Sequence, residues 1–401
     1  MRTIGMPTSL IFINVAHFLD HYFLLIFPTA VLAIHPAWEM SYAEALALGT
    51  PAFAAFALAT PVSGWLGDRW GGEKMMAVFF IGIALSSIAT AFAPGPLSLA
   101  AGLACIGVFA SIYHPVGTAL IVRHAVKTGR ALGVNGVWGN MGVAAAALAT
   151  GALTAWLGWR AAFLVPGVVT LVVGLGYLAT GLGSRATGGA GRGSTFVHAS
   201  RMDQIRVLAV VAVASLMGGL AFQGVTIAMP KLFEERLSSD VGLAGIGAWV
   251  SLVFALAAFT QIPVGRLLDR IGAKPIMFTL TGLQAVLLAV LWQVDGALTV
   301  VMAVPLMIAM FGEVPVSAWL IGHYVAANWR SRAYSIQFLL ALGVSSGVVP
   351  LIAWLHGRTG SSDALFLAMA CAMSAVFAAS WFLPGWRRSR PQAMPSAAPA
   401  Q

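Results

Sequence analysis

Twelve long apolar stretches constrain what this chain can fold into more than any other feature of its sequence. A helix that crosses the hydrocarbon core of a bilayer needs about 20 predominantly apolar residues, and each stretch is close to that length or longer. The connections are short, apart from one stretch rich in Gly, Ser and Arg. The sequence therefore predicts an all-α integral membrane protein whose spans cover residues 9–34, 44–66, 75–93, 97–122, 133–156, 161–182, 207–230, 243–264, 275–293, 297–325, 333–355 and 363–384.

The scarcity of charge supports this interpretation. Only 9% of the 401 residues are charged and 59% are hydrophobic, whereas soluble domains carry charge on about a quarter of their residues. Such a chain cannot cover its surface with solvated groups. The composition therefore excludes a cytosolic enzyme, a nucleic-acid-binding module and a disordered scaffold, and it makes the lipid bilayer the main partner.

Basic residues are distributed unevenly between the two sides of this twelve-span map. Of the 22 Lys and Arg residues, 18 lie on the side that holds both termini, and the other side holds Arg160, Lys231, Arg236 and Arg358. Cytoplasmic segments of membrane proteins are enriched in Lys and Arg. Both termini are therefore expected in the cytoplasm.

The stretch rich in Gly, Ser and Arg divides the spans into two groups of six. We expect an N-terminal six-helix half at residues 1–182, a cytoplasmic linker at 183–206 and a C-terminal half at 207–386. The remaining tail, 387–401, is dominated by Pro and Ala and is expected to be disordered.

A repeated segment supports the division into halves. The residues GWLGDRWG at 64–71 recur 201 positions later as GRLLDRIG at 265–272, in each case after the second span of a half. Two parallel halves related by an axis along the membrane normal are an architecture of secondary transporters. The repeat singles out candidate gating residues, which are Gly64, Asp68, Arg69, Gly71, Gly265, Asp269 and Arg270.

The repeated segment, with its pattern G-x-L-x-D-R-x-G, resembles the signature of the major facilitator superfamily, and GWRAAF at 158–163 is also similar to that superfamily. Within it, His17 with Asp20 and the segment YHPVG at 113–117 resemble the fosmidomycin-resistance branch of efflux proteins. The resemblance implies the major facilitator fold of two pseudo-symmetric six-helix halves. It also implies that the protein is a monomer in the bacterial inner (cytoplasmic) membrane and that its substrate is a small molecule.

Two acidic residues, Asp20 and Glu313, lie well inside predicted spans. Placing an ionised group at the centre of a bilayer costs at least about 2.5–3.5 kcal/mol on insertion scales, so each is a candidate functional residue. Successive residues of a helix are about 100° apart around its axis, so Asn14, His17 and His21 lie within a narrow arc of the first span. Including Asp20 makes this arc wider. This polar stripe predicts the lining of a cavity between the halves, although a stripe that hydrogen-bonds neighbouring helices is the alternative.

The fourth and tenth spans carry matching features. Tyr113 and His114 precede Pro115, and 200 residues later Glu313 takes the place of Tyr113 before Pro315. The two spans therefore place an ionisable group at equivalent positions of the two halves. Further polar or aromatic candidates for the pathway of substrate and protons are Gln223, Asn135 and Trp138.

These features favour proton-coupled efflux of a small polar or anionic compound or drug by alternating access. Protonated His17, His21 and His114 would hold the anion, and Asp20 and Glu313 would carry the proton. Two alternatives remain open. One is a divalent-metal transporter with His17, Asp20, His21 and Glu313 as ligands, and the other is proton-coupled uptake of a small carboxylate. We expect no enzymatic activity, no cofactor, no resident metal and no nucleic-acid partner.

The resemblance also implies that Asp68 approaches the positive N-terminus of a helix in the other half and latches the cytoplasmic side, a contact worth up to about 2 kcal/mol. We predict that Asp68→Asn preserves expression but strongly slows transport, because the neutral amide loses this attraction. Asp269→Asn should have a milder effect. Transport assays on equal amounts of the two variants test the assignment, and normal transport by Asp68→Asn would exclude it.

Overall fold

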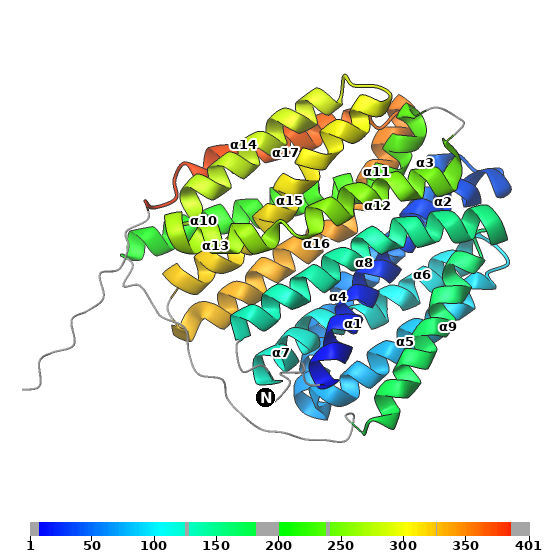
Figure 1. Ribbon diagram of the computed structural model, residues 1–401, viewed down its shortest axis with the longest axis horizontal. Coiled ribbons are helices and arrows are strands. Elements are labelled where there is room, and N and C mark those ends of the chain that lie inside the picture. The colour runs from blue at the N-terminus through cyan, green and yellow to red at the C-terminus, as the bar shows by residue number, and fades with distance from the viewer. Residues whose placement is uncertain (1–7, 125–127, 182–199, 238–240, 326, 386–401) are drawn as a thin grey trace, which may run out of the picture.

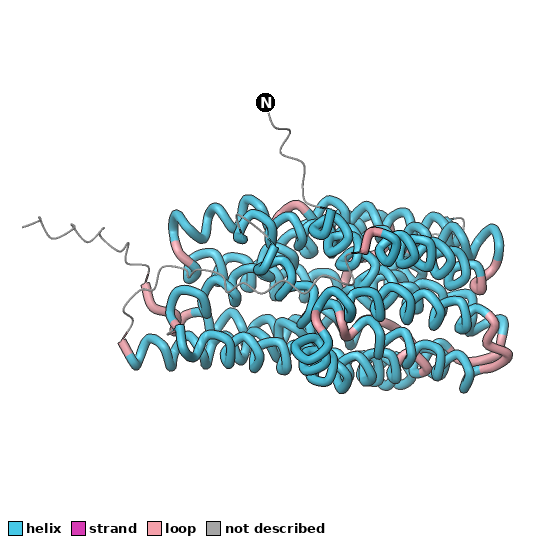
Figure 2. Tube along the Cα trace, turned by 90° about the horizontal axis from the view of Figure 1, so that it is seen from below, coloured by secondary structure: helices cyan, strands magenta, loops and turns pink. Residues whose placement is uncertain are grey.

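The computed structural model describes residues 8–124, 128–181, 200–237, 241–325 and 327–385. Within these ranges the regular structure is helical throughout. The helices run along the long dimension of the molecule and stack in several layers (Figures 1 and 2). Twelve spans are long and apolar enough to cross a membrane, which confirms the predicted all-helical fold and the number of spans.

The first six spans contain nine α-helices and a π-helical turn, Tyr113–Gly117, which lies between α6 and α7. The helices are α1 (Thr8–Leu24), α2 (Ile26–Ala37), α3 (Tyr42–Ala47), α4 (Thr50–Trp70), α5 (Gly72–Ala91), α6 (Pro96–Ala110), α7 (Thr118–His124), α8 (Thr128–Leu157) and α9 (Ala161–Ala179).

The second six spans contain eight α-helices and a second π-helical turn, Ala214–Gly218, which lies between α10 and α11. The helices are α10 (Arg201–Val213), α11 (Gly219–Arg236), α12 (Gly242–Ala258), α13 (Gln261–Ile271), α14 (Ala273–Leu291), α15 (Ala297–Tyr324), α16 (Ala327–Thr359) and α17 (Asp363–Ser380).

The first helix of the second half begins before its predicted span. Helix α10 begins at Arg201, six residues before the predicted span at 207–230, because the Ser200 hydroxyl caps it by accepting a hydrogen bond from the Asp203 amide. Such a cap satisfies one of the amides that a helix start leaves without a partner. Most of the predicted linker and the predicted tail lie outside the described residues.

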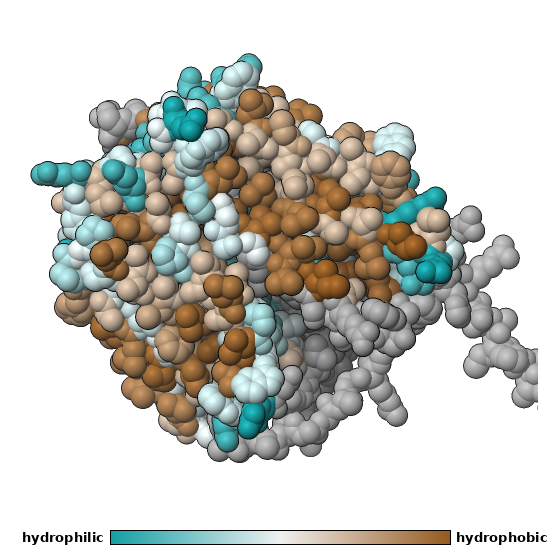
Figure 3. Space-filling model, turned by 180° about the vertical axis from the view of Figure 1, so that it is seen from behind, coloured by the Kyte–Doolittle hydropathy of each residue, from teal (hydrophilic) through white to brown (hydrophobic). Residues whose placement is uncertain are grey.

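Apolar side chains cover much of the outer surface. Leu58 is 78% exposed and Leu97 is 85% exposed, and many other large apolar residues are exposed with them. Figure 3 shows a broad hydrophobic area across one face, with hydrophilic groups gathered mainly toward its ends. Soluble monomers rarely expose contiguous apolar surface on this scale, so lipid is the solvent that this surface suits.

The repeated segment forms the same structure in both halves. Helix α4 continues through Arg69 and ends before Gly71, and α13 continues through Arg270 and ends before Gly272. The two terminal glycines have φ angles of 96° and 80°, a region that favours glycine. The segment therefore forms the last turns of a helix followed by a sharp reversal, whereas the sequence pattern placed it after the span.

The two halves contact each other along α8 and α12. A Cβ atom added to Gly247 would lie 2.4 Å from the carbonyl oxygen of Ala147, and one added to Gly151 would lie 2.8 Å from that of Leu243. Small residues permit this close approach of two backbones, as at many helix interfaces in membranes.

We predict that Gly247→Ala destabilises the protein by about 1–3 kcal/mol, because the added methyl group must push α12 away from α8. The matched control is Gly176→Ala in α9, where an added Cβ meets no atom within 4 Å. Thermal unfolding of both variants in detergent measures the effect. A midpoint that falls equally in both variants would contradict the inferred contact.

Candidate functional site

The position of α1 depends on two glycines of α8. A Cβ atom added to Gly142 would lie 2.1 Å from the carbonyl oxygen of Phe18, and one added to Gly139 would lie 2.5 Å from His17 Nε2. Only a residue without a side chain lets α1 approach this closely. The imidazole of His17 therefore lies directly over the backbone of α8.

Asn135 of α8 is the centre of a buried polar network. Its Nδ2 donates to Asn14 Oδ1 at 2.9 Å, and its Oδ1 accepts from the Tyr113 hydroxyl at 2.8 Å. Its carbonyl oxygen accepts from His17 Nδ1 at 2.8 Å. The ring of Tyr113 stacks on that of His17 with centroids 4.6 Å apart. One asparagine thus joins α1, α8 and the π-helical turn.

Three histidines converge beside this network. The Nε2 atoms of His17 and His21 lie 3.2 Å apart. One ligand nitrogen from each of His17, His21 and His114 lies within 4.8 Å of the other two, the one such grouping of histidine, cysteine and acidic side chains found in the described ranges. All three imidazoles are half-buried. We refer to them below as the histidine triad.

Asp20 lies next to the triad in a fully buried position. Its Oδ2 is 3.2 Å from His114 Nε2, and its side chain is 0% exposed. That contact is not a well-directed hydrogen bond, and neither carboxylate oxygen accepts one from any other described residue. A buried carboxyl group with so little compensation either keeps its own proton or takes a positive charge beside it.

The π-helical turn explains why His114 can reach α1. Tyr113–Gly117 has one residue more than an α-helical turn would hold, and it contains Pro115, which has no amide hydrogen. Single π-helical turns inside α-helices are frequent at functional sites. Here the turn directs His114 toward Asp20 and Tyr113 toward Asn135. By contrast, α15 continues unbroken through Pro315, so the sequence match between the two spans is not a match of backbone structure.

Glu313 forms a separate site in the second half. Its Oε2 accepts a hydrogen bond from Gln284 Nε2 of α14 at 2.8 Å. A Cβ atom added to Gly218 would lie 3.4 Å from Glu313 Oε1, so the second π-helical turn borders this carboxyl group. Asp20 and Glu313 therefore lie in opposite halves, and each is close to a π-helical turn.

Two other predicted residues are Trp138 and Gln223. Trp138 is 38% exposed on α8, and Gln223 is half-buried on α11, five residues after the second π-helical turn. Glu313, a metal ligand in one of the alternatives above, does not group with the histidines.

The predicted gating residues lie at the ends of α4 and α13. Exposed Asp269 accepts a hydrogen bond from Trp319 Nε1 at 3.0 Å, within its own half. Exposed Arg69 lies over the ring of Trp65, and Gly64 lies beside Pro115. Arg270 is exposed, and Gly265 has open space around it. The Asp68 side chain lies outside the described residues, so its latch remains a prediction.

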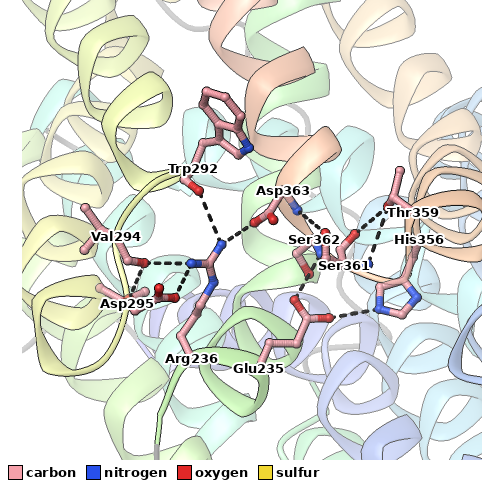
Figure 4. Close-up of polar contacts among 11 residues, drawn as sticks. Glu235, Arg236, Trp292, Val294, Asp295, His356, Thr359, Ser361, Ser362 and Asp363 are labelled. Carbon is pink, nitrogen blue, oxygen red and sulfur yellow. Dashed lines mark hydrogen bonds and ion pairs between the residues drawn. The ribbon is translucent and has the colours of Figure 1, made fainter.

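Sequence reasoning missed two features. One is Gln284, whose polar side chain in an apolar span was the signal that could have identified it. The other is an ion-pair network at the far end of the second half, shown in Figure 4. There Arg236 forms ion pairs with Asp295 and Asp363, and Glu235 accepts hydrogen bonds from His356 at 2.9 Å and from the Ser362 amide at 3.0 Å.

Tyr42 connects this network to the first half. Its ring centroid lies 4.8 Å from that of His356, and the ammonium group of Lys231 lies 4.9 Å from it. Tyr42 begins α3 in the first half, whereas Lys231 and His356 belong to α11 and α16 in the second half. The two halves are therefore in contact at the end of the molecule that carries few basic residues.

Twelve apolar spans, a doubled helix-terminal segment and ionisable groups inside both halves define a multi-pass membrane protein of the secondary-transporter class. The family described as the Major Facilitator Superfamily matches residues 10–341. The chain belongs to this superfamily.

Curated relatives match shorter segments. The chain is 35% identical over 114 residues to the puromycin resistance protein pur8 of Streptomyces alboniger, covering 28% of this chain and 23% of that protein. It is 27% identical over 118 residues to the putative metabolite transport protein YaaU of Escherichia coli strain K12, covering 29% and 27%. The matches thus span about a quarter of the length of either relative.

Solved structures share the fold along nearly the full chain. A peptide transporter POT in complex with sulfate aligns with a TM-score of 0.73 and 16% identity, covering 96% of this chain and 95% of that one. A bacterial homolog of the human lysosomal transporter Spinster, in an inward-facing and occupied conformation, aligns with a TM-score of 0.69 and 15% identity, covering 93% of both chains. These similarities confirm the fold class.

We predict that Asn135→Ala destabilises the protein by about 1–3 kcal/mol, because it leaves the buried Tyr113 hydroxyl without its acceptor. Tyr113→Phe removes that hydroxyl and keeps the ring on His17, so it should cost no more than about 1 kcal/mol. Thermal unfolding in detergent compares the two. An Asn135→Ala variant as stable as Tyr113→Phe would show that the network contributes little.

Proposed function

We propose that this protein is a proton-coupled secondary transporter that exports a small polar or anionic compound or drug by alternating access. The single observation that carries the proposal is the placement of Asp20 and Glu313 in opposite halves, each inside a span and each bordered by a π-helical turn. A transporter that moves protons needs carboxyl groups that can be exposed alternately to the two sides.

The two sites are suited to different roles. Glu313 has an uncharged partner in Gln284, which can donate to the carboxylate and leaves the carboxyl group free to bind and release a proton. Asp20 is adjacent to imidazoles that can themselves titrate. We therefore assign coupling to Glu313, and substrate binding or proton relay to Asp20 with the histidine triad.

An anionic substrate suits the first half. A protonated imidazole of the triad would attract the anion, and Asn14 and Asn135 lie beside the triad. The similarity of one segment to a puromycin resistance protein supports export of a drug-like compound. The resemblance of His17, Asp20 and YHPVG to the fosmidomycin-resistance branch supports the same direction and a polar cargo.

The remaining parts of the proposal concern orientation and gating. We propose a monomer in a bacterial inner membrane with both termini in the cytoplasm, in keeping with the bias of basic residues. The halves are proposed to be residues 1–182 and 207–386. The contact of Tyr42 with His356 and Lys231 would then close the external side, and the repeated segments would act on the cytoplasmic side.

The experiment uses purified protein in proteoliposomes with a panel of labelled small anions and drugs, puromycin included, screened first by counterflow. With the cargo identified, we predict that Glu313→Gln abolishes uptake driven by a pH gradient but keeps substrate exchange, because exchange requires no net proton movement. Asp20→Asn should impair both.

The matched control is Asp203→Asn, which removes a carboxylate at the start of α10, outside both sites. It should retain both activities. Concentration of substrate by Glu313→Gln in response to a pH gradient would refute the assignment of coupling. If wild-type protein shows counterflow with no compound of the panel, that result would count against the proposed substrate class.

A further inference from the structure

We propose that the histidine triad is a binding site for a divalent transition-metal ion such as Zn²⁺ or Co²⁺, with His17, His21 and His114 as the three protein ligands. The proposal goes beyond the transport reaction proposed above and does not depend on it, because binding is measured without transport. It also differs from the sequence analysis, which expected no resident metal and, in its alternative, grouped Glu313 with the first-span residues.

The hydrogen bonding of His17 prepares this imidazole to bind a metal. A carbonyl oxygen can only accept, so Nδ1 of His17 must carry the hydrogen that it donates to the Asn135 carbonyl at 2.8 Å. That bond fixes the orientation of the ring and leaves Nε2 as the ligand atom. Metal-binding histidines usually have such a partner on their second nitrogen.

The spacing of the nitrogens fits a four-coordinate ion. His17 Nε2 and His21 Nε2 lie 3.2 Å apart, close to the distance of about 3.3 Å between two nitrogens bound to tetrahedral zinc at about 2.05 Å. The two atoms now share one hydrogen-bonded proton, and a metal ion would take its place. The ligand nitrogens of the triad all lie within 4.8 Å of one another, so the imidazole of His114 needs to move inward by no more than about 1.5 Å to complete the site.

Asp20 supplies the charge that such a site needs. Its carboxylate is fully buried, lacks a well-directed hydrogen bond from any described residue, and lies 3.2 Å from His114 Nε2. A small rotation of either side chain would let Nε2 of His114 donate to Asp20 Oδ2 and would leave Nδ1 of His114 for the ion, as in carboxylate–histidine–zinc arrangements. The negative charge of ionised Asp20 would also offset part of the charge of the ion.

Access and an open coordination position complete the argument. The three imidazoles are half-buried rather than sealed, so an ion can reach them. Three protein ligands leave one tetrahedral position for water or for an anionic group of a solute. Imidazole nitrogen also favours zinc, copper, nickel and cobalt over Mg²⁺, which prefers oxygen ligands.

The test is the titration of full-length protein without a polyhistidine tag, purified in detergent and stripped with a chelator, with Zn²⁺ by calorimetry and Co²⁺ by visible absorption. We expect one Zn²⁺ per chain, no binding of Mg²⁺, and the intense absorption of four-coordinate Co²⁺ with nitrogen ligands. His21→Asn should weaken binding by more than about 100-fold, and Asp20→Asn should weaken it roughly 10–100-fold.

The matched control is His35→Asn, which removes a half-buried histidine of the same half that is not in the triad. It should bind Zn²⁺ as tightly as the wild type. Two results with wild-type protein would overturn the proposal, whether or not the variants fold. One is the absence of stoichiometric Zn²⁺ binding, and the other is a Co²⁺ spectrum typical of six-coordination. Unchanged binding by a folded His21→Asn variant would overturn it as well.

Discussion

The contact of α1 with α8 is the interaction on which the candidate site depends. Gly139 and Gly142 allow the backbone and His17 of α1 to lie against α8. Asn135, one helical turn earlier on α8, then binds Asn14, Tyr113 and His17. Without this close approach, the polar stripe of the first span could not meet the fourth span, and the three histidines would not converge.

The sequence was sufficient to predict the fold and the polar stripe of the first span, but not how the polar residues pair. Hydropathy reports whether a segment prefers lipid, so the twelve spans could be read directly, and the repeat was visible in the sequence although its helical structure was not. Asn14, His17, His21 and Asp20 were assigned to one stripe by helical periodicity, and they do lie together. The resemblance to the fosmidomycin-resistance branch remains a prediction.

The unpredicted features depend on rotation and register between helices, which a single sequence does not encode locally. The bond between Gln284 and Glu313 joins residues 29 positions apart on two helices, and the proximity of His114 to Asp20 requires a π-helical turn. The second turn, Ala214–Gly218, contains no proline, and α15 continues unbroken through Pro315, so Pro115 alone does not predict a π-helical turn. The early start of α10 was missed because polar residues of its first turn, Arg201, Asp203 and Arg206, are also typical of linkers.

The bonding of Arg236 has a consequence for the mechanics of the molecule. The ion pairs with Asp295 and Asp363 tie the tips of α11, α15 and α17 together, all within one half (Figure 4). Across the seam between the halves, Tyr42 offers an aromatic face to His356 and Lys231. Arg236 is only 11% exposed and also donates to the Val294 carbonyl, so several polar contacts hold the elements of this half together, whereas Tyr42 meets the other half here through its ring. At this end the molecule should therefore hinge at the seam and stay rigid within the half.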